Sequence, residues 1–217
     1  HAAGDYVALY EARDSYGNTA KKRIKIKISP VAEGEQKLLT EPATVENGSL
    51  GFSASQYVYE EKVSIRMTVG SINGVVMFNL RGSVGNTDWP QGMVFRLTDT
   101  GQCTISAKAH DEAVFASCDL NTETYLGKSI VLSYQTRNVK IDGVEYLQVR
   151  VWIDDNEISF FATEKAQTDL LWGEGGVYRK KADFTGEQAD NVYASPVWIA
   201  VYNASVTIEE VTLSPGK

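Results

Sequence analysis

Hydrophobic and polar residues alternate with a period of two along most of the chain, and Gly, Asn, Asp or Pro interrupts the runs. Strands that bury one face and expose the other show this pattern, so the sequence predicts an all-β protein in which helices are scarce. The clearest expected strands are residues 22–29, 63–69, 75–81, 93–98, 130–136, 147–153, 197–202 and 206–213.

Two short segments have the composition of tight hairpin turns. Asp142-Gly143 and Asp155-Asn156 each separate two alternating runs. Gly and Asn tolerate the positive φ angles that such turns require, so we expect a β-hairpin at each position.

The two cysteines flank a third expected hairpin. A turn at His110-Asp111 would place Cys103 directly opposite Cys118 on the paired strand. A disulfide closing a loop of this length would stabilise the fold by about 3 kcal/mol, and it would favour an oxidising compartment. Two reduced cysteines, buried as small apolar side chains, are an equally acceptable interpretation.

A polar, non-periodic segment at residues 29–35 divides the chain into residues 1–30 and residues 31–217, because few contacts need to cross such a segment. The first unit resembles the last two strands of bacterial immunoglobulin-like repeats in its G-x-Y … A-x-D-x-x-G-N pattern, formed by Gly4, Tyr6, Ala12, Asp14, Gly17 and Asn18. About 30 residues cannot form such a sandwich, which needs roughly 100. We therefore interpret this unit as the C-terminal strands of a truncated neighbouring domain.

The second unit resembles the concanavalin A-like lectin and glucanase superfamily, which includes laminin-G-like domains. The resemblance covers roughly residues 35–213 and rests on an opening strand at 45–52 and on the segments SIRM at 64–67, VMFNLR at 76–81, WPQGMVFRL at 89–97, VRVWIDDN at 149–156 and IAVYNASVTI at 199–208. It implies a two-sheet antiparallel jelly-roll sandwich. Immunoglobulin-like repeats ahead of such a domain imply an extracellular multidomain protein, secreted or attached to the cell surface.

Composition and charge exclude some partners. The chain has 217 residues, of which 43% are hydrophobic, and its formal net charge is −7. Nucleic acids and anionic membranes bind positively charged surfaces, so we expect neither as a partner. No apolar run approaches the roughly 18 residues that cross a bilayer. Because the chain starts at His1 without an initiator Met, we expect its natural N-terminus further upstream, and the missing leader says little about the compartment.

The sequence contains no recognisable pattern of catalytic residues. Glycosidases of the resembled superfamily place paired acids on one strand, in a pattern like E-x-D-x-x-E, and that pattern is absent. The nearest acidic cluster, Asp154, Asp155 and Glu157, lies at an expected hairpin tip, where side chains diverge into water. His1 and His110 have neither triad partners nor metal-spaced ligands. We therefore expect no catalytic residues in this module.

Calcium is the ion that the resemblance implies, since many members of the superfamily bind it through Asp, Asn and backbone carbonyls. The candidates are Asn86 and Asp88 in one expected turn, and Asp154 and Asp155 in another. Such tracts are also typical of plain solvated turns, so no metal ligand is assigned.

Strand alternation assigns side chains to opposite faces of the expected sheets. With Phe78, Ile65 and Ile199 turned inward, their neighbours point outward. Aromatic rings that stack on a pyranose, with amide and guanidinium groups that bind hydroxyls or a carboxylate, form the usual sugar-binding set. The predicted carbohydrate-binding residues are Arg66, Asn79, Arg81, Trp198 and Tyr202 on strands, and Trp89 at one edge.

A second stripe of similar composition consists of Tyr146, Gln148, Arg150 and Trp152. The resemblance places its strand on the convex sheet, and the strands at 75–81 and 197–202 on the concave, ligand-holding sheet, so this stripe is the second choice. Alternatively, outward aromatics pack under loops, notably residues 164–196, and outward arginines are simply solvated. The arginines on expected strands, at positions 66, 81, 96, 137 and 150, favour an anionic sugar.

These patterns together predict a non-catalytic carbohydrate-binding module of a secreted or surface multidomain bacterial protein, which could accompany a glycoside hydrolase. Its expected partners are a glycan or polysaccharide and neighbouring domains of the same chain. One alternative is a structural or adhesive surface module that binds another protein or acts as a spacer. A glycosidase that uses unrecognised acids is a third and weaker alternative.

Overall fold

The structure, a computed structural model, describes residues 4–28, 34–52, 62–81, 91–108, 114–162, 170–173, 176–180 and 197–216. These residues are mainly β-strand, and none of their helices is long and apolar enough to cross a membrane. The elements are β1 (Gly4–Arg13), β2 (Thr19–Ile28), β3 (Gln36–Lys37), β4 (Ala43–Phe52), β5 (Lys62–Arg81), β6 (Gln91–Thr98), β7 (Gln102–Lys108), β8 (Val114–Asp119), the 3-10 turn η1 (Thr122–Thr124), β9 (Ser129–Ile141), β10 (Val144–Ile153), β11 (Asn156–Glu157), β12 (Phe161–Ala162), β13 (Leu170–Gly173), β14 (Gly176–Lys180) and β15 (Val197–Ser214).

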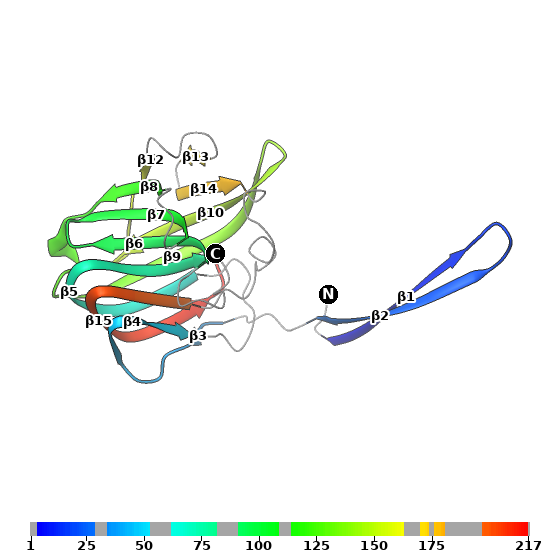
Figure 1. Ribbon diagram of the computed structural model, residues 1–217, viewed down its shortest axis with the longest axis horizontal. Helices are drawn as coiled ribbons and strands as arrows, with labels where there is room; N and C mark the ends of the chain where they lie inside the picture. The colour runs from blue at the N-terminus through cyan, green and yellow to red at the C-terminus, as the bar shows by residue number, and fades with distance from the viewer. Residues whose placement is uncertain are drawn as a thin grey trace.

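The strands β1 and β2 form a two-stranded hairpin of their own, drawn apart from the other strands in Figure 1. Its turn begins at Asp14, whose carboxylate accepts hydrogen bonds from the backbone N–H groups of Tyr16 and Asn18, both at 2.9 Å. A hydrogen bond from the Asn18 amide holds the pKa of the Asp14 carboxyl below its ordinary value. The assignment of residues 1–30 to a neighbouring domain stays a prediction.

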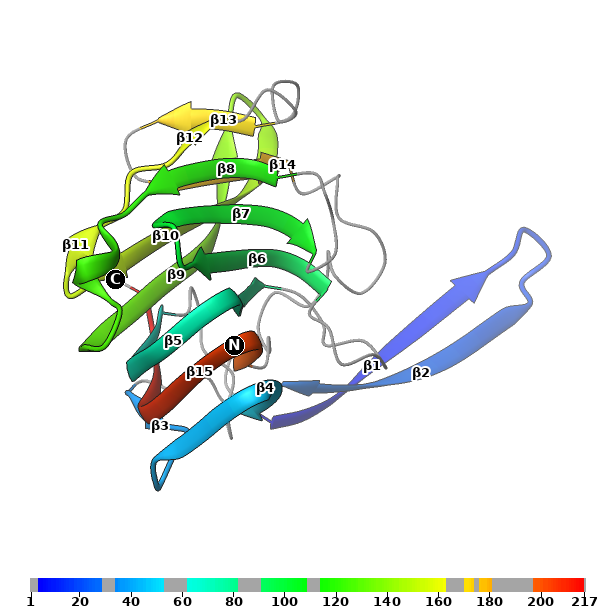
Figure 2. The ribbon, with the colours of Figure 1, turned by 60° about the vertical axis from the view of Figure 1, so that its left-hand side comes forward.

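The remaining strands form two antiparallel sheets that face each other (Figures 1 and 2). The first sheet runs in the order β13–β14–β10–β9–β5–β15–β4, with β3 beside β15 and β11 beside β10. The second sheet runs in the order β12–β8–β7–β6–β5–β15–β4. The prediction of an all-β, two-sheet antiparallel jelly-roll sandwich is confirmed.

The long strands β5 and β15 belong to both sheets. The N-terminal half of β5 pairs with β9 and its C-terminal half pairs with β6, while β15 follows β5 over almost its whole length. The sequence pattern predicted two separate strands in each case, at 63–69 and 75–81 and at 197–202 and 206–213. That prediction was wrong, because register shifts bend these strands without ending them.

The core lies between the two sheets. The first sheet contributes Ile65, Met67 and Val69, and the second contributes Phe78 and Phe95, all of them fully buried. Burying an apolar side chain of this size contributes about 1.5–3 kcal/mol. This apolar layer therefore holds the two sheets together.

Both predicted hairpin turns are present, one of them shifted by a residue. Asp142 and Gly143 adopt φ angles of 49° and 84°, as a tight two-residue turn requires. The second turn consists of Asp154 and Asp155, with φ angles of 48° and 64°, and Asn156 already belongs to β11. The expected turn was one residue too late, because Asp as well as Asn tolerates the left-handed region.

The register of β7 and β8 places Cys103 opposite Cys118. The structure joins them by a disulfide, with their Cα atoms 5.0 Å apart. Both cysteines are buried in the core. The expected turn at His110-Asp111 lies outside the described residues.

Replacing Cys103 and Cys118 together by Ala should lower the free energy of unfolding by about 3 kcal/mol. The disulfide spans 15 residues and restricts the unfolded chain, and the double variant loses that restriction. Urea denaturation of both proteins measures the difference. Titration of the unfolded, unreduced wild-type protein should find no free thiol, and a finding of two would contradict the pairing.

Candidate functional site

The second sheet carries two rows of side chains on its outer face, the face turned away from the core. Residues directly opposite one another in paired strands share a face. From β4 to β12, one row consists of Ser49, Ala200, Met77, Arg96, Thr104, Ser117 and Phe161. The adjacent row consists of Tyr202, Val75, Thr98, Gln102 and Asp119.

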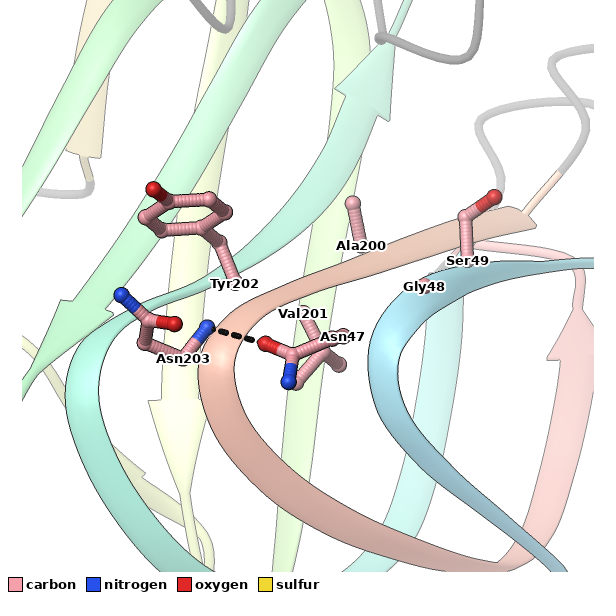
Figure 3. A pocket seen from close by; sticks show the side chains of 7 residues that line it. All are labelled: Asn47, Gly48, Ser49, Ala200, Val201, Tyr202 and Asn203. Carbon is pink, nitrogen blue, oxygen red and sulfur yellow. Dashed lines mark hydrogen bonds between the residues drawn. The ribbon is translucent and has the colours of Figure 1, made fainter.

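A shallow pocket of about 530 Å³ lies on this face, where β4 and β15 bend (Figure 3). The side chain of Tyr202 is 54% exposed. In Figure 3 its ring stands on the same side as the side chains of Ala200 and Ser49. A ligand can therefore reach the face of the Tyr202 ring. The residues that line the pocket are Asn47, Gly48, Ser49, Ala200, Val201, Tyr202 and Asn203.

Two asparagines in the left-handed region shape this pocket. Asn47 and Asn203 have φ angles of 49° and 46°, a region that Asn tolerates better than most residues. The backbone N–H of Asn203 donates to the Asn47 Oδ1 atom at 2.6 Å, as the dashed line in Figure 3 shows. This bond lies where the pairing of β15 with β4 shifts register, between Val201 and Ser205. It fixes the bend from which the Tyr202 ring projects.

The pocket combines one apolar surface with neutral polar groups. The exposed ring of Tyr202 offers its face, and its phenol offers a donor and an acceptor. The amides of Asn47 and Asn203 and the hydroxyl of Ser49 supply further donors and acceptors. This arrangement suits a ligand that is apolar on one face and rich in hydroxyl groups along its edge.

Two predicted residues share this outer face but are buried. Trp198 is only 6% exposed, because it packs in a small cluster with Met77, Val94 and Ala200. Asn79 is buried as well. The structure thus places Trp198, Asn79 and Tyr202 on the expected face. Of these three residues, Tyr202 is the exposed one.

The structure does not bring Arg66 together with the other predicted residues. Arg66 lies on the part of β5 that belongs to the first sheet, so its side chain points to the opposite side of the sandwich. Its Nε atom lies 3.8 Å from a carboxylate oxygen of Glu210. Arg81 ends β5, opposite Met93. The side chain of Arg81 and the whole of Trp89 lie outside the described residues.

The second predicted stripe lies on the outer face of the first sheet. Gln148 is buried there: Arg137 donates to its Oε1 atom, and its Nε2 atom donates to the Tyr178 hydroxyl at 2.8 Å. Tyr146, also buried, lies on the same strand. Trp152 is half-buried, and the Lys62 ammonium lies 5.1 Å from the centroid of its ring.

Arg150, in the same stripe, forms a bidentate ion pair with Glu157. Its Nε and Nη2 atoms lie 2.8 and 2.5 Å from the two carboxylate oxygens. The ion pair raises the pKa of Arg150 and lowers the pKa of the Glu157 carboxyl. The Arg150 guanidinium also lies 4.9 Å from the centroid of the Trp152 ring. The polar side chains of this stripe, Gln148 and Arg150, are bound to neighbouring residues of the first sheet, so they are less available to a ligand than Tyr202.

The calcium candidates give no cluster. The Asp154 Oδ1 atom accepts a hydrogen bond from the Val131 backbone N–H at 2.8 Å, which anchors the hairpin turn. Asp155 is exposed in the same turn, while Asn86 and Asp88 lie outside the described residues. In the described part of the chain, no three His, Cys, Asp or Glu residues are placed to hold a metal ion.

Sequence reasoning missed Asn47, Ser49 and Asn203 as site residues. The Asn47-Gly48 pair is a composition typical of turns and bends. Together with the Asn203 segment, it could have indicated two bends. Their contact could not be predicted, because 156 residues separate the two asparagines.

Comparison with known proteins shows a general likeness of fold. No protein-family model matches the chain, and no curated protein matches it in sequence. Among solved structures, the galectin LEC-6 of Caenorhabditis elegans is 10% identical, with 83% of this chain and 95% of that chain covered and a TM-score of 0.43. The carbohydrate-binding module CBM66 of Bacillus subtilis is also 10% identical, with 85% and 99% covered and a TM-score of 0.45.

A third similar structure is the CBM40 module of a Ruminococcus gnavus sialidase, solved with a bound sialyllactose. It is 12% identical, with 82% of this chain and 92% of that chain covered and a TM-score of 0.39. All three TM-scores lie below 0.5, so these are distant similarities to other β-sandwich proteins. At these identities the likeness concerns the fold alone.

The bend beside the pocket should not accept a larger residue at position 74. A Cβ atom on Gly74 would lie 2.4 Å from the Tyr202 backbone oxygen, so Gly74→Ala must displace β5 from β15. We expect a loss of about 1–3 kcal/mol in the free energy of unfolding, measured by urea denaturation. A Cβ atom on Gly34 meets nothing within 4 Å, so Gly34→Ala is the matched control. Equal stability of the two variants would contradict the assigned register.

The ion pair of Glu157 should make stability depend on pH. Its folded-state pKa lies below the ordinary value of 4.5, because Arg150 stabilises the carboxylate. The pair therefore stabilises the fold above about pH 4.5, and this stabilisation is lost as the pH falls through the lowered pKa. The Tm of the wild type should exceed that of Glu157→Gln at neutral pH, with the difference vanishing in acid. Glu35→Gln, at an exposed glutamate, is the control. A difference independent of pH would contradict the ion pair.

Proposed function

We propose that this protein is a non-catalytic carbohydrate-binding module and that its sugar binds in the pocket beside Tyr202. The observation that carries the proposal is an exposed aromatic ring that lines one pocket together with Asn47 and Asn203. A pyranose has a face of C–H groups that stacks on an aromatic ring and an edge of hydroxyls that bond to neutral donors and acceptors. The pocket supplies both kinds of contact.

The lining of the pocket favours binding over catalysis. Its residues include no carboxylate, His, Lys or Cys. Hydrolysis of a glycosidic bond uses a pair of carboxyl groups, one on each side of the bond. The polar groups of the lining are the amides of Asn47 and Asn203, the Ser49 hydroxyl and the Tyr202 phenol, which can bind the hydroxyls of a sugar.

The proposal extends to the setting of the module. The disulfide between Cys103 and Cys118 fits an oxidising environment, so we place the protein outside the cell, secreted or on the surface. The β1–β2 hairpin exposes apolar side chains and would be marginally stable alone, which favours a neighbouring domain of immunoglobulin-like type. We assign the sandwich to the concanavalin A-like superfamily and propose a multidomain bacterial parent, in which the module could serve a glycoside hydrolase.

One observation favours a second function, that of a structural or adhesive module. Trp198, Met77, Val94 and Ala200 form a buried cluster on the outer face of the second sheet. Part of this face is therefore closed, as it would be in a domain that serves as a spacer. Sugar binding distinguishes the two functions.

Binding to carbohydrates is the direct test. The protein is screened on a glycan array and by affinity electrophoresis in gels that contain xylan, laminarin, hydroxyethyl cellulose or polygalacturonate. We expect binding to at least one glycan and a loss of about tenfold or more in affinity for Tyr202→Ala, because the stacking surface is removed. Folded protein that binds none of these glycans would overturn the proposal.

Two further variants separate the pocket from general effects. Tyr16 is 90% exposed in the turn of the β1–β2 hairpin, so Tyr16→Ala removes an exposed tyrosine outside the pocket and should bind as the wild type does. Asn203→Gly keeps a residue that adopts positive φ and removes one amide, so it should fold normally and bind several-fold more weakly. Equal losses for Tyr16→Ala and Tyr202→Ala would contradict the assigned site.

A further inference from the structure

A second exposed aromatic residue lies on the same face as Tyr202. Phe161 on β12 is 51% exposed, and it occupies the row of Ser117, Thr104 and Arg96 on the outer face of the second sheet. Its neighbour Phe160 points the other way, into the core, where it packs against Phe95 in a T-shaped arrangement with the ring centroids 6.2 Å apart. The two orientations agree with the register and place Phe161 outside the core.

The described side chains between the two aromatic rings are mainly polar. The path between the rings passes Thr98, Gln102, Thr104 and Ser117, which are half-buried or exposed and carry hydroxyl or amide groups. Val75 is the apolar member of this path and is also half-buried. The path borders the buried cluster around Trp198, against which Val75 packs.

The two aromatic residues are too far apart for one small sugar to touch both. Tyr202 is on β15 and Phe161 on β12, with β5, β6, β7 and β8 between them. Five steps of about 4.8 Å between neighbouring strands give a span of roughly 24 Å. A ligand that contacts both rings must therefore be a chain of several sugar units lying across the strands.

The charges on this face favour a neutral chain. Within the two rows, Arg96 and Asp119 carry charges of opposite sign, and Asp119 is the exposed one. Three of the five arginines that suggested an anionic sugar, Arg66, Arg137 and Arg150, lie on the first sheet and bind Glu210, Gln148 and Glu157. They cannot contact a ligand on the second sheet. Of the other two, Arg96 is the arginine of the row described above, and the side chain of Arg81 lies outside the described residues.

We infer that the ligand of the proposed site is a neutral, extended glycan chain that runs across the second sheet from Tyr202 to Phe161. This inference rests on the proposed function and names the class of sugar. The Tyr202 pocket holds one unit, the hydroxyl and amide side chains bind the units that follow, and the ring of Phe161 stacks on a unit at the far edge.

The test measures how affinity depends on chain length. Oligosaccharides of xylose and of β-1,3-linked glucose, from disaccharide to octasaccharide, are titrated against the whole chain by isothermal calorimetry. Affinity should rise with length until the chain spans both rings and then level off. The gain from shortest to longest ligand should be about tenfold or more. Acidic oligosaccharides of galacturonic acid should bind about tenfold more weakly than neutral ones.

Variants of the two aromatic residues identify which end of the chain each contacts. Phe161→Ala should remove the gain with length and leave the affinity for the disaccharide unchanged. Tyr202→Ala should weaken ligands of every length. Val144→Ala is the matched control, since Val144 is an exposed apolar residue on the first sheet, and it should bind as the wild type does.

The possible failures are distinguishable. If the folded protein binds no sugar of any length, the proposed function itself fails. If the disaccharide binds as tightly as the octasaccharide, with Tyr202→Ala harmful and Phe161→Ala harmless, the pocket stands and the extended chain is overturned. Preference for galacturonic acid oligomers would overturn the neutral class alone.

Discussion

The alignment of β15 between β4 and β5 is the constraint on which the rest of the structure depends. The strand β15 is hydrogen-bonded to both β4 and β5 in the first sheet and again in the second. Because the backbone continues through the bends, the position of one sheet determines the position of the other. The register shifts near Tyr202 and Asn203 supply the bends, and the apolar layer around Phe78 fills the space that they enclose.

The same alignment separates two outer faces of different character. On the first sheet, long side chains satisfy one another, as in the ion pair of Arg150 with Glu157 and the hydrogen bond of Arg137 to Gln148. On the second sheet, short hydroxyl and amide side chains lie between exposed aromatic rings. The second face therefore presents short polar side chains and exposed rings to a ligand, whereas the long polar side chains of the first face are paired with one another. This difference underlies the proposed location of the sugar.

The sequence predicted what depends on short-range patterns and missed what depends on long-range register. Alternation placed Phe78 in the core and Asn79 on the other face of its strand, and turn composition located the hairpin at Asp142-Gly143. The sequence pattern could not show that Arg66 and Asn79, which lie on one continuous strand, belong to different sheets. The burial of Trp198 and the Asn47 contact to Asn203 likewise depend on residues far apart in the chain.

The bend that forms the pocket also has a mechanical consequence. A molecule seated beside Tyr202 touches β4 and β15 where both strands cross from one layer to the other. The ligand would contact the strands at the bend that joins the two sheets, so that unfolding of either sheet would require the ligand to dissociate. Occupancy and resistance to unfolding would then rise together through mass action.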